Sequence, residues 1–214
     1  MRMGVVADDL TGSTDIGIMF TKAGYSTEIF TFQSKDGALA AQVQSSTADV
    51  VILNTNARLF PENAAYEIAH QATLTLRQAG CRQYYNKTCS VFRGPVGAYF
   101  DGMLDALDAN FALVVLGFPK NGRLTIGGLH YVHGKLLEES EFRSDPIHPM
   151  RQSNLIAILQ EQTRRKVAAL TEVGGLSPDE LGQQIDAAKA TCSYLILDVP
   201  DQAALATIAQ AAGD

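Results

Sequence analysis

The chain has 214 residues, of which 46% are hydrophobic and 19% charged, enough for one large or two small domains with a buried core. Its 17 basic and 23 acidic residues give a formal net charge of −6, which argues against a protein that binds nucleic-acid backbones through a basic face. The longest apolar runs are far shorter than the ~20 residues of a membrane-spanning helix. Modest charge and ordinary apolar content also argue against disorder.

Cysteine usage indicates a reducing compartment. Cys81, Cys89 and Cys192 are too few for a disulfide framework, and their spacing fits no zinc site. The apolar N-terminal stretch is interrupted by aspartates at positions 8 and 9, so we expect no secretory signal. These features predict a cytoplasmic protein.

Short β-rich runs alternate with longer runs of helical spacing along most of the chain. The pattern predicts strands over residues 3–7, 26–32, 49–53, 82–85, 112–116, 166–170 and 194–199. It predicts helices over residues 11–23, 37–44, 61–80, 96–107, 154–162, 178–190 and 201–212, the sixth of them begun by Ser177. This alternation is typical of an α/β, Rossmann-like fold, in which helices cover both faces of a mostly parallel sheet.

The region 117–150 interrupts this rhythm. It is rich in glycine, proline and charged residues, and residues 129–137 around His133 and Gly134 predict a hairpin. We therefore expect a β-hairpin insertion near 117–150, at the edge of the sheet. His130 and His133 would point to opposite faces of such a hairpin, which disfavours a joint metal site.

The first chemical motif follows the first predicted strand. Asp8 and Asp9 precede Thr11 and Gly12 at the start of a helix. Ligands of open α/β sheets bind at the carboxyl ends of strands, so both carboxylates are candidates to accept hydrogen bonds from sugar hydroxyls, to take a proton or to hold a metal. The alternative is that Asp9 or Thr11 merely caps the helix. The segment lacks the glycines and the Lys-Ser/Thr ending of a phosphate-binding loop.

Two further motifs place cations at predicted strand ends. In one, Lys87, Ser90 and Arg93 precede a helix whose N-terminal amides and dipole favour an anion. In the other, Lys120 and Arg123 stand among glycines. An arginine fork matches a carboxylate or a phosphate, although isolated loop charges of this kind are often merely solvated. By composition alone, we expect an α/β protein that binds a small polyhydroxylated anion.

Together these motifs resemble the four-carbon acid sugar kinases. The matching segments occur in order over most of residues 5–162: Ala7–Ser13 with Asp15 and Gly17, Lys87–Gly97, Gly122-Arg123 with Gly127-Gly128, Phe142 with Asp145-Pro146 and His148-Pro149, and Ser153-Asn154-Leu155. The resemblance implies an ATP-dependent kinase that phosphorylates the terminal hydroxyl of a four-carbon sugar acid such as threonate, erythronate or a 2-oxo-tetronate. It also implies an N-terminal domain for the sugar acid and a C-terminal domain for the nucleotide.

Residues 1–214 would then form the sugar-acid-binding domain alone. ATP and Mg²⁺ would bind mainly to a C-terminal nucleotide domain absent from this chain and supplied in cis or in trans, so we expect little or no kinase turnover from this chain by itself. We expect no nucleic-acid or membrane partner, and a homodimer is left open. The alternative is a stand-alone sugar-acid-binding or regulatory domain without catalysis. An NAD-dependent enzyme is disfavoured because the first turn lacks the G-x-G-x-x-G spacing.

Carried over by position, the resemblance also implies residue roles. Asp8 and Asp9 would hold substrate hydroxyls, and one of them would assist deprotonation of the attacking hydroxyl. Arg93 and Arg123 would hold the carboxylate or the transferring phosphate. The remaining substrate-binding residues expected from the resemblance are Thr11, Lys87, Ser90 and Gly94. Many members have an acidic residue where this chain has Cys89.

Overall fold

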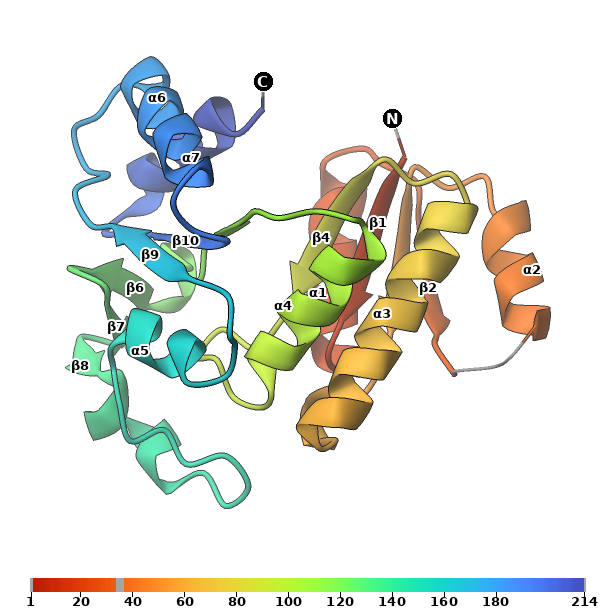
Figure 1. Ribbon diagram of the computed structural model, residues 1–214, viewed down its shortest axis with the longest axis horizontal. Coiled ribbons are helices and arrows are strands. Elements are labelled where there is room, and N and C mark those ends of the chain that lie inside the picture. Colours follow the sequence, from red (N-terminus) through yellow and green to blue (C-terminus); the bar gives the residue numbers. More distant parts are fainter. Residues whose placement is uncertain (1, 34–36, 214) are drawn as a thin grey trace. The chain divides into compact units, whose positions relative to one another are not determined.

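The chain divides into two compact units in the computed structural model, which describes residues 2–33 and 37–213. Unit 1 comprises Met1–Cys89 and Gly94–Ala109, and unit 2 comprises Ser90–Arg93 and Asn110–Asp214. Figure 1 shows that each unit carries its own strands and helices.

Unit 1 is built on a parallel sheet of four strands in the order β2-β3-β1-β4. The strands are β1 (Met3–Ala7), β2 (Thr27–Thr31), β3 (Val50–Asn54) and β4 (Gln83–Lys87). Every residue of β3 is buried, as expected for an inner strand of a parallel sheet covered on both faces. The carboxyl ends of all four strands lie at one edge of this sheet, because the strands are parallel.

Helices cover both faces of this sheet. They are α1 (Leu10–Lys22), α2 (Gly37–Ser45), α3 (Glu62–Gln78) and α4 (Val96–Ala106). On one face, Phe20 of α1 packs against the cluster that contains Val5 and Ile52. On the other face, Leu76 of α3 lies 3.1 Å from where a Cβ at Gly4 would be. α3 also contacts both α2 and α4, so these three helices share one layer (Figure 1).

Gly102 allows α3 and α4 to approach each other closely. A Cβ at this position would lie 2.5 Å from the carbonyl oxygen of Tyr66 on α3, closer than real Cβ contacts come. We expect Gly102→Ala to lower the free energy of unfolding by about 2–3 kcal/mol, the upper part of the range for overpacked sites. Urea unfolding measures this loss. Gly37→Ala is the control, because a Cβ there meets open space, and a loss equal to that control would contradict the prediction.

Unit 2 contains a second parallel sheet, in the order β5-β10-β9. Its elements are β5 (Ala112–Val114), β9 (Val167–Leu170), β10 (Tyr194–Leu197), α5 (Leu155–Gln160), α6 (Pro178–Lys189) and α7 (Gln202–Ala211). Leu181 of α6 and Ile208 of α7 pack against Leu195 and Leu197 of β10 in one apolar cluster. The predicted start of α6 is confirmed, because Ser177 and Glu180 form a capping box there.

A separate antiparallel sheet follows β5 in the chain. It contains β6 (Arg123–Ile126), β7 (Leu129–Val132) and β8 (Lys135–Leu136). Gly127 and Gly128, with φ of 62° and 74°, form the two-residue turn between β6 and β7. That turn needs left-handed backbone at both positions, which glycine adopts most easily. The predicted hairpin around His133 and Gly134 is β7-β8.

The predicted α/β, Rossmann-like class is confirmed, but the pairing of the strands differs from the expectation in two places. The strand predicted at 112–116 does not extend the first sheet, because β5 pairs with β10 in the second. Residues 123–126, for which the pattern predicts no strand, form β6. Both differences depend on pairing partners distant in sequence, which local patterns do not contain.

Three other expectations concern the cysteines, metals and the membrane. Cys81, Cys89 and Cys192 are all buried and free of disulfides. Over residues 2–33 and 37–213, no three His, Cys, Asp or Glu side chains gather to form a metal site. Within the same ranges, each helix is too short or too polar to cross a membrane.

Candidate functional site

Asp8 and Asp9 follow β1 at the carboxyl edge of the unit 1 sheet. The backbone N–H of Asp8 donates to the carbonyl of Lys87 at the end of β4 (3.2 Å). Asp9 caps α1, because its Oδ1 accepts a hydrogen bond of 2.7 Å from the backbone N–H of Gly12. A Cβ at Gly12 would lie 2.7 Å from that oxygen, so glycine is what lets the cap close. The capping role considered for Asp9 is therefore confirmed. Its other oxygen, Oδ2, contacts Arg58.

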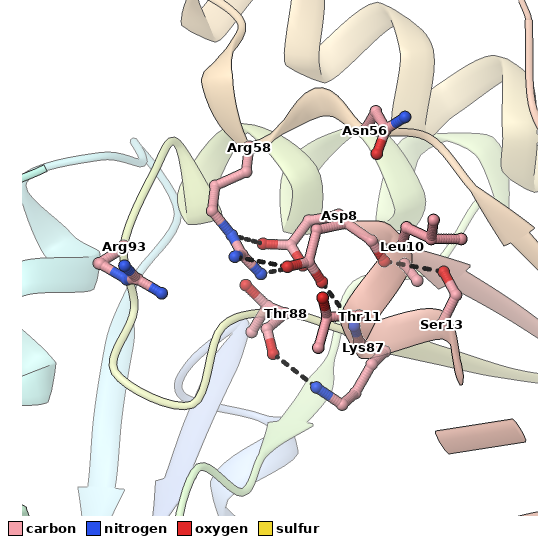
Figure 2. A network of polar contacts seen from close by, with 12 residues as sticks. Asp8, Leu10, Thr11, Ser13, Asn56, Arg58, Lys87, Thr88 and Arg93 are labelled. Atoms are coloured by element: carbon pink, nitrogen blue, oxygen red, sulfur yellow. Dashed lines mark hydrogen bonds and ion pairs between the residues drawn. The ribbon is translucent and has the colours of Figure 1, made fainter. Parts of the chain in front are cut away.

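Arg58 joins the two aspartates, and Figure 2 shows its guanidinium beside Asp8. Its Nε and Nη2 donate to the two carboxylate oxygens of Asp8, each at 2.9 Å. Its Nη1 lies 2.7 Å from Oδ2 of Asp9. The residue stands in the short helix η1 (Ala57–Leu59) that follows β3, and its backbone N–H donates to the carbonyl of Asp8 at 3.2 Å. The segments that follow β1 and β3 thus meet at one guanidinium, and the end of β4 is hydrogen-bonded to the backbone of Asp8.

Burial separates the two carboxylates. The side chain of Asp8 is 1% exposed and that of Asp9 is 27% exposed. Burial raises the pKa of Asp8 above its usual value, while the hydrogen bonds and charge of Arg58 act in the opposite direction. Burial lowers the pKa of Arg58. The hydrogen bond and the charge of Asp8 oppose this effect, and the net result is a raised pKa. Of the two aspartates, only Asp9 presents an appreciable surface to a ligand.

Lys87, Thr11 and Gly94 lie in the same unit. Lys87 donates from Nζ to the carbonyl of Thr88 (3.2 Å), and its Nζ lies 3.3 Å from where a Cβ at Gly12 would be, beside the start of α1. Thr11 is exposed in the first turn of α1. At Gly94, with φ of 91°, a Cβ would lie 2.9 Å from the carbonyl oxygen of Arg58. The predicted residues of unit 1 therefore gather near the start of α1 and near Arg58.

Two buried hydroxyls belong to this unit. Oγ1 of Thr88 and the hydroxyl of Tyr99 have no hydrogen-bond partner within the described part of the chain. Burial, followed by the charge of Asp8, raises the pKa of Tyr99, so its phenol remains neutral at physiological pH. The phenol is thus a potential hydrogen-bond donor without an acceptor.

Unit 2 holds two arginines on one aromatic ring. The guanidinium of Arg93 lies 5.0 Å from the ring centre of Phe142, and that of Arg123 lies 5.4 Å from it. Nη1 of Arg93 also pairs with Oδ2 of Asp145 at 2.7 Å. The backbone N–H of His148 and then Arg93 lower the pKa of Asp145 to about 2. Asp145 is therefore a permanent anion beside Arg93.

Arg123 has no such counter-charge. It is 8% exposed, and its Nη1 donates a long hydrogen bond of 3.4 Å to the carbonyl of Asn121. Its Nε has no partner among the residues that the structure describes, and no carboxylate among them pairs with it. Burying a guanidinium with an unpaired Nε and no counter-ion is costly, which is typical of a position that receives an anionic ligand.

His130 lies beside Arg123 and is fully buried. Its Nδ1 lies 3.2 Å from Oγ1 of Thr125, its cross-strand neighbour. Burial lowers the pKa of His130 to about 4; the backbone of Ser90 opposes this effect and the charge of Arg123 adds to it. The imidazole is therefore neutral at physiological pH. Ser90 thus joins Arg93 and Arg123 in unit 2.

Asp198 is a buried carboxylate that we did not predict. It directly follows β10 and accepts hydrogen bonds from the backbone N–H groups of Gly127 and Gly128, the latter at 3.0 Å. Burial raises its pKa, and the two N–H groups oppose that shift. The residue anchors the β6-β7 turn to the central strand of the sheet. A charged residue immediately after a fully buried strand is the sequence signal that could have indicated it.

The predicted residues form two groups, each within one unit. Group 1 comprises Asp8, Asp9, Thr11, Lys87 and Gly94, with Arg58 added by the structure. Group 2 comprises Ser90, Arg93 and Arg123. The expected association of Lys87 with Ser90 and Arg93 is not found within one unit, since Lys87 belongs to unit 1. Two carboxylates balance two cations in group 1, whereas group 2, with Asp145 against its two arginines, keeps one positive charge.

Known proteins resemble this chain over almost its whole length. A family model described as a sugar-binding N-terminal domain matches residues 3–214. A 3-oxo-tetronate kinase of Pseudomonas savastanoi pv. phaseolicola is 32% identical over 224 residues, which cover 99% of this chain and 50% of that protein. The chain therefore spans about half the length of this relative.

Solved structures also match almost the whole of this chain and about half of the other protein. A Haemophilus influenzae protein superposes with a TM-score of 0.89 at 29% identity, covering 99% of this chain and 51% of that one. A Bordetella bronchiseptica protein, described as a domain of unknown function with bound citrate and a domain-swapped dimer, superposes with a TM-score of 0.86 at 28% identity. That match covers 99% of this chain and 50% of the other.

Proposed function

Because this chain belongs to the sugar-binding N-terminal domain family of the four-carbon acid sugar kinases, we propose that it binds a four-carbon sugar acid as the phosphoryl acceptor of a kinase. The relative from Pseudomonas savastanoi is named for a 3-oxo-tetronate, which makes this acid the first substrate to test. The 3-oxo group differs from the 2-oxo acid suggested by the resemblance. Threonate and erythronate are the corresponding hydroxy acids.

The observation that carries this proposal is the uncompensated charge of Arg123. A carboxylate or phosphate would supply the acceptors that its guanidinium lacks. Arg93 also lies over the ring of Phe142, but it has Asp145 as its own counter-ion. An anionic ligand in group 2 would therefore neutralise its one remaining positive charge. In group 1 the same ligand would be repelled by the carboxylates of Asp8 and Asp9.

Group 1 suits hydroxyl groups rather than an anion. Its charges already balance, and its most exposed carboxylate is Asp9. Each carboxylate oxygen has two lone pairs, so Asp9 can accept a hydroxyl hydrogen while keeping its bonds to Gly12 and Arg58. In phosphoryl transfer most of the catalysis is positioning and charge neutralisation, so a weak base at Asp9 suffices to take the proton of the attacking hydroxyl. Thr11 and Lys87 supply neighbouring polar groups.

Residues 2–33 and 37–213 do not fit the magnesium ion of a nucleotide complex. Both oxygens of Asp8 are bonded to Arg58, and the described residues include no group of three potential metal ligands. We assign ATP and Mg²⁺, which would supply the phosphoryl group, to a nucleotide domain acting in cis or in trans in the cytoplasm. This chain alone is then expected to bind the acid and to show little or no turnover.

Arg123→Ala tests the proposed anion site. We expect the affinity for threonate to fall about 10–100-fold, the range for losing a charge-assisted contact of a few kcal/mol. The reason is that alanine removes the guanidinium that would pair with the acid. Calorimetry of wild type and variant measures the change, with threitol as the matched neutral polyol. Arg77→Ala is the control, since Arg77 pairs with Asp108 at the surface. Equal losses for threonate and threitol would argue against an anion at Arg123.

A further inference from the structure

We infer that Arg58 is a positioning residue that fixes Asp9 for a substrate hydroxyl, and that Asp8 serves Arg58 rather than the ligand. The inference rests on the proposed function for the identity of the ligand. It rests on the geometry of unit 1 for everything else. Asp8 and Asp9 are neighbours with the same side chain, and the sequence predicts the same role for both, whereas their contacts in the structure differ.

The contacts separate these roles. Both oxygens of Asp8 accept from one guanidinium fork, and the side chain is 1% exposed, so a ligand has almost no surface of Asp8 to touch. Asp9 is 27% exposed and holds one N–H donor on each oxygen, the amide of Gly12 and Nη1 of Arg58. A carboxylate held at both oxygens cannot rotate freely about its Cβ–Cγ bond. Its remaining lone pairs therefore keep a fixed direction toward a hydroxyl.

The choice of arginine fits this role. Two adjacent carboxylates repel each other, and a cation placed between them offsets that repulsion. The planar guanidinium offers donors on three nitrogens, and here Nε and Nη2 reach Asp8 while Nη1 reaches Asp9. A lysine ammonium is a single point and cannot match this fork. Asp8 orients the guanidinium, and the guanidinium orients Asp9.

A double-mutant cycle on the 214-residue chain tests this order of action. We expect Arg58→Ala to weaken threonate binding at least 10-fold in the wild-type background and less than 2-fold in the Asp9→Ala background, since a residue that acts through Asp9 adds nothing once Asp9 is gone. Arg58→Lys should restore binding only in part. Losses that multiply in the double variant would show that Arg58 contacts the ligand itself, and unchanged binding in Arg58→Ala would also overturn the inference.

Two additional measurements keep the test decisive. If Arg58→Ala does not fold, the Asp8→Asn/Arg58→Gln variant takes its place. It removes both charges together, so neither is left buried without a partner. If wild type binds no sugar acid, the proposed function fails, and hydrogen exchange of the Gly12 amide still reads the position of Asp9. Loss of Arg58 should then reduce protection of that amide at least several-fold, whereas Arg77→Ala should not. Unchanged protection of Gly12 would overturn the positioning role.

Discussion

Arg58→Ala is expected to lower the free energy of unfolding by about 3–5 kcal/mol, the range for removing one partner of a buried ion pair. The reason is that the Asp8 carboxyl group would remain in a site that is 1% exposed while losing both of its hydrogen-bond donors and its counter-charge. Alanine at Arg77, whose partner Asp108 is exposed, should cost no more than about 1 kcal/mol. Urea unfolding followed by circular dichroism measures both losses.

The pH dependence of that loss has a defined sign. Burial already raises the pKa of Asp8, and removing Arg58 removes the two largest contributions that lower it. A carboxyl group whose folded pKa exceeds its unfolded pKa stabilises the fold at low pH, and this contribution disappears as the pH rises through the folded pKa. The deficit of Arg58→Ala relative to wild type should therefore be larger at pH 8 than at pH 5. An equal deficit at the two values would contradict a buried, unpaired Asp8.

The second large effect concerns His130 and acid. Its folded pKa of about 4 lies below the ordinary value of 6.5, so the unfolded chain takes up the proton first as the pH falls. The stability that neutral His130 contributes is complete above about pH 6.5 and is lost between there and about pH 4. A shift of this size corresponds to about 3 kcal/mol, at 1.36 kcal/mol per pKa unit. Protonation of a fully buried ring is the physical cause.

Substitution isolates this contribution. His130→Asn keeps a polar group near Thr125 but does not titrate, so the variant should lose about 3 kcal/mol less than wild type between pH 7 and pH 4. His133→Asn is the matched control in the next turn, because His133 is exposed and has a left-handed φ of 49° that asparagine accepts. Urea unfolding at several pH values measures the slopes. Identical slopes for His130→Asn and wild type would exclude His130 as the source.

Local patterns predicted most of the elements because their signals lie within the elements themselves. The short apolar run of β1 and the Ser177 cap of α6 are examples. The assignment of β5 to the second sheet was not predictable, since only its pairing with β10 decides it. β6 is a short strand bounded by glycines, and its pairing with β7 depends on a turn anchored by Asp198, which lies 70 residues beyond Gly128.

The candidate site was predictable to a similar degree. Asp8 and Asp9 were predicted because ligands of parallel sheets bind at strand ends, but the different roles that we propose for them depend on Arg58. That residue stands 50 positions from Asp8 and belongs to no motif in the sequence. The register of β1 with β3, which pairs Ala7 with Asn54, brings the two loops together. Such a register follows from tertiary packing, not from the residues of either strand.

The central claim, that this chain binds a four-carbon sugar acid, is tested most directly by thermal unfolding of the 214-residue chain with 3-oxo-tetronate, threonate and erythronate, each with and without Mg-ATP. An acid present at ~100 times its dissociation constant should add about 2.7 kcal/mol, seen as a rise of roughly 2–4 °C at this size. We predict such a rise with at least one acid and no response to Mg-ATP alone. A folded chain whose transition no acid shifts, even where calorimetry extends the search to millimolar concentrations, would contradict the claim.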